Sequence, residues 1–163
     1  MDQVRQMCQL IPRRKKSLDK MIAHWRKKFD QVLPDKPDLI VVPEACDRPS
    51  GFSGEKLRQY YKVRKDQIQK FFAQVAKDNN CYIVYSAHQE MSDGTLRNSS
   101  VLIDRKGNVA GIYNKNHPTI GEIEKGVLCG KDAPVIECDF GRVAMAICFD
   151  LPDHWHIIKS RKI

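Results

Sequence analysis

Apolar residues recur at three- and four-residue spacing in two stretches of the chain, and this spacing predicts two amphipathic helices. The first stretch follows Ser17, a residue type that often caps the start of a helix, and it extends to about Leu33. The second runs from Glu55 to about Asp78. Its expected core-facing positions are Ile68, Phe71, Phe72 and Val75.

Short apolar runs bounded by turn residues predict strands between and after these helices. In chain order the runs are Ile40–Val42, Cys81–Ala87, Asn98–Asp104, Asn108–Tyr113, Pro134–Cys138 and Arg142–Phe149. Gly107 lies between the third and the fourth run, where a hairpin connection needs a positive φ. Because helices come first and hairpins later, the order predicts an α/β fold with a mixed sheet and helices on one face. The other face would be bare or covered by something else.

Three of these runs lead into residues that carry chemistry. DLIVVPE ends in Glu44, VAGIYNKNHP contains Lys115, and RVAMAICFD contains Cys148. Strand ends are where α/β folds collect reactive groups, although such residues also occur as an inert core cysteine and solvated charges. As a site, Glu44 would take the proton of Cys148, while Lys115 would favour the thiolate and stabilise an oxyanion. With the backbone N–H of Phe149 as a second oxyanion donor, these parts describe acyl transfer through a thioester.

The three motifs together resemble the carbon–nitrogen hydrolase (nitrilase) family, which has a glutamate, a lysine and a cysteine in this order. The resemblance runs from about Ser17 to Asp150. Supporting matches are Pro43, Asn98-Ser99-Ser100, Gly107, Tyr113-Asn114, His117-Pro118, Gly141 and Asp150. It implies an α–β–β–α sandwich and hydrolysis of a non-peptide carbon–nitrogen bond in a small amide, N-carbamoyl amine or nitrile.

The family pattern also implies a role for each residue of the site. Glu44 would be the general base, Lys115 would stabilise the tetrahedral intermediate, and Cys148 would be the nucleophile. A second glutamate follows the lysine in the family, and the IEKG context favours Glu124 for it over Glu122. The resemblance implies neither a metal nor an organic cofactor, and it suggests a homo-oligomer.

The two ends of the chain depart from the family pattern. Residues 1–16 form a poorly defined basic segment, in which Met1–Pro12 fits a helical face or a frayed strand that Pro12 ends. Residues 151–163 are an atypical tail, and the family's second half does not follow. We therefore expect one partial domain over residues 1–163, an incomplete and truncated sandwich whose exposed apolar sheet face favours association. His154 and His156 form an HxH pair, a weak metal-binding signal without a third ligand.

Composition narrows the class of protein. The chain has 163 residues, 42% of them hydrophobic and 29% charged, which fits one soluble globular domain. No apolar run approaches the ~20 residues of a membrane helix, and no signal peptide is visible, so we expect a cytoplasmic protein. The six cysteines form no CxxC pair, and we expect reduced thiols without a structural zinc site.

The formal charge of +8 is concentrated near the N-terminus, where residues 1–36 contain ten Lys or Arg and four Asp or Glu. We interpret it as solvated helix faces, because specific nucleic-acid binding would need interleaved aromatic residues or a recognisable module. Three alternatives remain. They are an inactive family member acting as a binding protein, a basic nucleic-acid-binding protein, and a redox sensor that pairs Cys148 with Cys129 or Cys138.

Overall fold

The computed structural model describes residues 2–151, with the side chains of residues 15–151. The helices are α1 (Asp2–Val32), the short 3₁₀ helix η1 (Leu33–Asp35), α2 (Gly54–Arg64), α3 (Gln67–Asn79) and α4 (Ile120–Ile123). The strands are β1 (Leu39–Val41), β2 (Tyr82–Glu90), β3 (Leu96–Ile103), β4 (Val109–Asn114), β5 (Val135–Cys138) and β6 (Gly141–Ala144). The mixed α/β fold predicted from the sequence is therefore confirmed.

The main sheet has the strand order β1-β2-β3-β4. β1 runs parallel to β2, whereas β2, β3 and β4 pair antiparallel. The β3–β4 connection turns at Gly107, whose φ of 82° confirms the predicted hairpin glycine. β5 and β6 form a separate two-stranded hairpin. The sheet is thus mixed, and its parallel pair β1–β2 includes the strand that leads to Glu44.

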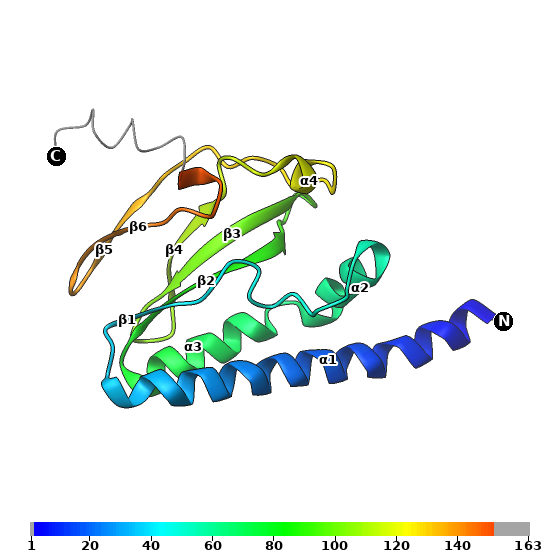
Figure 1. Ribbon diagram of the computed structural model, residues 1–163, viewed down its shortest axis with the longest axis horizontal. Coiled ribbons are helices and arrows are strands. Elements are labelled where there is room, and N and C mark those ends of the chain that lie inside the picture. Colours follow the sequence, from blue (N-terminus) through cyan, green and yellow to red (C-terminus); the bar gives the residue numbers. More distant parts are fainter. Residues whose placement is uncertain (1, 152–163) are drawn as a thin grey trace.

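One face of the sheet is covered by α1 and α3, which lie side by side beneath it (Figure 1). Leu18 and Phe29 of α1 and Ile68 and Phe72 of α3 are buried there with apolar side chains of β2 and β3. Trp25 packs edge-on against Phe72 and donates its indole N–H to the Cys46 carbonyl at 2.8 Å. The long helix therefore also fixes the loop that follows Glu44.

The opposite face of the sheet is covered by the β5–β6 hairpin and by Met145 and Ile147, which follow it. The buried residues of this layer are Tyr82, Val84, Leu102, Tyr113, Met145 and Ile147. The hairpin lies so close that a Cβ at Gly111 would be 2.3 Å from the Ile136 Cδ1 atom, which explains the glycine in β4. Arg105, in the turn after β3, also holds the hairpin, because its Nε atom lies 2.7 Å from Oδ2 of Asp139 between β5 and β6. The same guanidinium pairs with Asp38 just before β1.

Three local predictions are wrong. α1 runs unbroken through Pro12 and Ser17, so neither ends or caps a helix, because the lysines and arginines between them are good helix formers. The single helix expected over Glu55–Asp78 is two helices, since Lys65 adopts a φ of 48° between them. The last strand ends at Ala144 rather than Phe149, and Cys148 lies in a turn. Within residues 2–151, none of the helices is both long and apolar enough to cross a membrane.

Candidate active site

The ends of β1 and β4 bring Glu44 and Lys115 together, although 71 positions separate them in the sequence. The Lys115 side chain is 1% exposed, and its Nζ atom lies 3.0 Å from the Glu44 Oε1 atom. Glu44 is 33% exposed, so its carboxylate borders both the buried ammonium and the solvent-facing side. The position of Lys115 is fixed by backbone bonds from its N–H to the Asn98 carbonyl and from the Gly130 N–H to its carbonyl.

Two further residues complete a group that we call the lysine cluster, defined as Glu44, Asn98, Lys115 and Glu122. Glu122 Oε2 lies 2.9 Å from Lys115 Nζ, and the Asn98 amide donates to both carboxylates at 2.7 Å. One ammonium and one amide thus hold two carboxylates that would otherwise repel each other. The resemblance had marked Asn98 only as a residue of the hairpin, and its contact with the carboxylates was not foreseen.

The glutamate that contacts Lys115 is Glu122, whereas Glu124 is exposed and lies outside the cluster. The expectation that Glu124 occupies this place is therefore wrong in geometry. Thr119 explains the difference, because its N–H and its hydroxyl donate to Glu122 Oε2 at 2.8 and 3.0 Å in a capping box at the start of α4. The T-x-x-E spacing of Thr119 and Glu122 was the signal in the sequence that could have identified the glutamate beside Lys115.

The cluster changes the acid–base properties of its members. Burial alone would lower the pKa of Lys115, but hydrogen bonds and attraction from Glu122 and Glu44 outweigh it and raise that pKa. Burial would likewise raise the pKa of Glu122, yet the Thr119 N–H, Lys115 and Asn98 lower it to about 2. Lys115 and Glu122 therefore stay ionised together across the neutral pH range.

Cys148 lies in the turn after β6, in a left-handed conformation with a φ of 45°, and its side chain is exposed. This conformation is uncommon for a residue with a Cβ, and it sets the thiol on the outside of a tight turn. Cys148 and Glu44 line the same cavity of about 320 Å³, together with Ser100 and Val84 of the sheet. Cys148 and one residue of the lysine cluster thus border a common space.

Asp150 fixes the segment Ile147–Leu151, which we call the cysteine turn. It is fully buried and accepts the Ile147 N–H at 3.0 Å, the Tyr113 hydroxyl at 2.7 Å and the His117 N–H at 2.8 Å. Burial opposes ionisation of this carboxyl, but these donors lower its pKa. Since Tyr113 and His117 flank Lys115 in the sequence, one carboxylate attaches the cysteine turn to the segment that carries the lysine.

The Phe149 amide, the expected second oxyanion donor, lies within the cysteine turn. Its neighbours Asp150 and Leu151 donate their N–H groups to the carbonyls of Ile147 and Cys148, at 3.0 and 3.2 Å. Within residues 2–151, the Phe149 N–H has no acceptor of its own. It is therefore available to an oxygen bound beside Cys148.

Signals for metal or disulfide chemistry are weak in the part of the chain that the structure describes. It contains no group of three His, Cys, Asp or Glu side chains arranged to hold a metal ion. The His154–His156 pair lies outside the described residues. Cys129 is exposed and Cys138 half-buried, and both are free thiols, as is Cys148.

The family model of the carbon–nitrogen hydrolases matches residues 4–161, so the chain belongs to the carbon–nitrogen hydrolase family. It is 28% identical to a beta-ureidopropionase of Arabidopsis thaliana over 69% of this chain and 29% of that protein. It is also 28% identical to a probable nitrilase of Schizosaccharomyces pombe over 83% of this chain and 50% of that protein. The crystal structure of the Caenorhabditis elegans NitFhit protein shares the fold, with a TM-score of 0.70 and 18% identity over 82% of this chain and 35% of that one. The chain thus spans half or less of the length of these relatives.

Proposed function

We propose that this chain hydrolyses a non-peptide carbon–nitrogen bond through a thioester on Cys148, with Glu44 as general base and Lys115 as the cation that stabilises the oxyanion. The observation that carries the proposal is the position of Glu44. One of its oxygens lies 3.0 Å from the Lys115 ammonium, and its side chain lines the cavity that Cys148 also lines. A base that contacts a buried cation and shares a cavity with a thiol supplies the parts that acyl transfer needs.

In the acylation step, Glu44 takes the thiol proton as the Cys148 sulfur attacks the carbonyl carbon of an amide. The oxyanion that forms is stabilised by the Lys115 ammonium and by the N–H of Phe149, which has no other acceptor among the described residues. The intermediate then collapses: the carbon–nitrogen bond breaks, Glu44 returns its proton to the nitrogen, and ammonia or an amine leaves. The product on the enzyme is a thioester of Cys148.

In the deacylation step, Glu44 takes a proton from water, and the resulting hydroxide attacks the thioester carbon. The carbon–sulfur bond breaks, the carboxylic acid leaves, and the thiol of Cys148 regains a proton. Glu122 remains ionised throughout because its pKa is lowered to about 2, so it positions Lys115 and does not compete for the proton. Asn98 supports the same arrangement by donating to both carboxylates.

Two relatives support a proposal for the substrate class. They are a beta-ureidopropionase and a probable nitrilase. We propose a small amide, N-carbamoyl amine or nitrile as the substrate of this chain. We also propose that the chain self-associates, because apolar side chains such as Val41, Ile120 and Val135 are more than half exposed.

Intact-protein mass spectrometry after incubation with a panel of amides, N-carbamoyl amines and nitriles tests the mechanism. We expect an acyl adduct on the chain together with release of ammonia, and neither with the Cys148→Ala variant. A Cys129→Ala variant is the matched control, because Cys129 is also exposed and free but lies outside the cavity of Glu44. A folded chain that gives no adduct and no ammonia would overturn the proposal and favour the inactive binding protein.

A further inference from the structure

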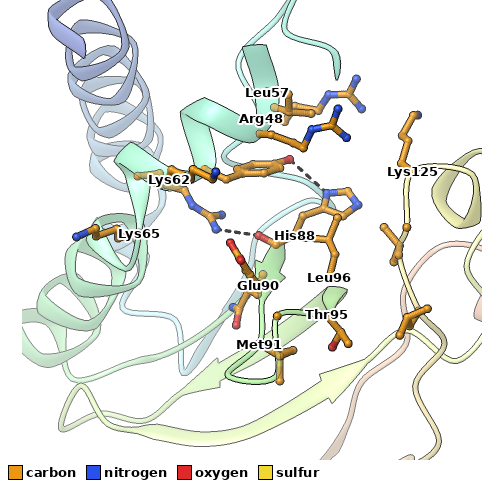
Figure 2. A pocket seen from close by; sticks show the side chains of 18 of the residues that line it. Arg48, Leu57, Lys62, Lys65, His88, Glu90, Met91, Thr95, Leu96 and Lys125 are labelled. Atoms are coloured by element: carbon orange, nitrogen blue, oxygen red, sulfur yellow. Dashed lines mark hydrogen bonds between the residues drawn. The ribbon is translucent and has the colours of Figure 1, made fainter. Parts of the chain in front are cut away.

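A second cavity of the described residues lies apart from Cys148. It has a volume of about 1140 Å³, and its walls come from α2, the β2–β3 connection and the segment after α4 (Figure 2). None of its lining residues lines the cavity of Glu44 and Cys148. It borders the lysine cluster only at Glu122, whose Oε1 atom is 3.7 Å from the Nε2 atom of His88, another lining residue. We call it the α2 cavity.

The inner surface of the α2 cavity is largely apolar. The apolar and aromatic side chains that line it are Leu57, Tyr61, Tyr85, Met91, Leu96, Val127 and Leu128. His88 is held against Tyr61, with its Nδ1 atom 3.4 Å from the tyrosine hydroxyl, and burial lowers the pKa of its imidazole. With these side chains, the interior offers an apolar surface that suits a small organic molecule.

The rim of the α2 cavity carries an excess of positive charge. Its cationic lining residues are Arg48, Arg58, Lys62, Arg64, Lys65 and Lys125, and its carboxylates are Asp66, Glu90 and Glu122. Two of these carboxylates contact cations outside the lining, Asp66 that of Lys70 and Glu122 that of Lys115, which Glu122 shares with Glu44. The six cations of the lining therefore outnumber its three carboxylates.

Two of the rim cations are neutralised as well, since Arg58 pairs with Glu55 and Arg64 with Asp47. Within residues 15–151, Lys62, Lys65 and Lys125 form no ion pair. Figure 2 shows Lys62 and Lys65 on the α2 side of the cavity and Lys125 across from them. Cations on two walls of a concave, largely apolar site concentrate positive potential inside it.

We propose that the α2 cavity binds a small organic carboxylate. Its apolar body would lie on apolar side chains of the lining such as Leu57 and Val127, and its charge would face Lys62 and Lys125. The apolar surface supplies most of the affinity, and the unpaired lysines select the anion over a neutral or cationic analogue. This site is distinct from the one proposed for hydrolysis, and it does not depend on a reaction at Cys148. Because Glu122 and His88 also line this cavity, an occupant would lie next to the lysine cluster.

Nuclear magnetic resonance titration of the ¹⁵N-labelled Cys148→Ala chain tests this proposal without any turnover. The probes share one apolar body and differ in charge: 3-phenylpropionate, 3-phenylpropan-1-ol and 3-phenylpropylamine. We expect 3-phenylpropionate to shift the amides of Gly94 and Gly126, which line the cavity, and to bind at least tenfold more tightly than the alcohol. The amine should bind more weakly still, and the affinity for the carboxylate should fall as salt rises.

A charge reversal locates the selectivity. The double variant Lys62→Glu/Lys125→Glu should lose at least tenfold in affinity for 3-phenylpropionate, because each reversal replaces an attraction by a repulsion. The matched control is Lys20→Glu/Lys27→Glu, which changes the net charge equally at exposed positions of α1 and should bind as before. Equal affinity for acid and alcohol, or shifts confined to residues around Cys148, or an unaffected Lys62→Glu/Lys125→Glu variant would overturn the proposal.

Discussion

The lysine cluster and the cysteine turn differ in how completely the fold holds them. In the cluster, the buried ammonium of Lys115 contacts two carboxylates at 3.0 and 2.9 Å, and Asn98 donates to both. In the turn, the side chain of Cys148 is exposed, and the surrounding backbone is held through the carboxylate of Asp150. The charges are thus fixed in a buried arrangement, whereas the thiol remains accessible.

The difference fits the roles that we propose for the two regions. A cation that stabilises an oxyanion is effective when it is fixed and shielded from water before the reaction starts. A nucleophile must instead be reached by a substrate. Cys148 is exposed in a turn where its backbone adopts the uncommon left-handed φ of 45°. We therefore expect substitutions in the cluster to change stability strongly and substitution of the thiol to change it little.

The largest effect on stability is expected for Lys115→Met. The variant leaves Glu44 and Glu122 facing each other without the ammonium between them, and breaking a buried ion pair on one side costs about 3 kcal/mol or more. Urea unfolding followed by circular dichroism measures the change. Lys106→Met, at an exposed position of the β3–β4 turn, is the control and should stay within about 0.5 kcal/mol of the unsubstituted chain. Equal stability of both variants would show that the cluster is not a structural centre.

A somewhat smaller loss, about 2–3 kcal/mol, is expected for Asp150→Ala, because the donors of Tyr113, Ile147 and His117 lose their buried acceptor. The same unfolding measurement applies, with Asp132→Ala at an exposed position as the control. A second readout is the rate of iodoacetamide modification of Cys148, followed by mass spectrometry. If Asp150 holds the turn, this rate changes in Asp150→Ala, while the rate at Cys129 stays constant.

Much of the comparison between the two regions could be predicted from the sequence. Glu44 and Lys115 both follow apolar runs that form strands. Because hydrophobic pattern and turn residues mark the ends of strands, the sequence could predict that both residues lie at strand ends. The core stripe of α3 and the glycine turn at Gly107 were equally local signals, and both are confirmed. The pattern succeeds where one short segment determines the structure.

The sequence analysis failed where side-chain hydrogen bonds, rather than the hydrophobic pattern, decide the outcome. The choice between Glu122 and Glu124 depends on the capping box of Thr119 and on the ammonium of Lys115, and the surrounding IEKG pattern contains neither. The end of the last strand depends on Asp150, which bends the backbone at Ile147 by accepting bonds from two loops. Pro12 was given too much weight as a helix stop, since α1 continues through it.

A pH titration sharpens the comparison with a smaller effect. The folded-state pKa of Glu122 is lowered to about 2, below its ordinary value, so its contribution to stability is fully present above that ordinary value. The contribution is lost as the pH falls through the folded-state pKa, and Glu122→Gln should flatten the loss of stability between about pH 4.5 and 2. Unfolding midpoints across this range measure it. Glu124→Gln, at an exposed position, is the control and should keep the slope.

The smallest change in stability is expected for Cys148→Ala. Its side chain is exposed and has no hydrogen-bond partner among the described residues, so the free energy of unfolding should stay within about 0.5 kcal/mol. Any adduct formation and ammonia release should nevertheless disappear, because alanine has no nucleophile to form the thioester. A chain that unfolds at the same urea concentration but no longer reacts would separate the exposed reactive group from the buried charges. If Cys148→Ala instead destabilised the chain as much as Lys115→Met, the thiol would be part of the core, and the division between cluster and turn would not hold.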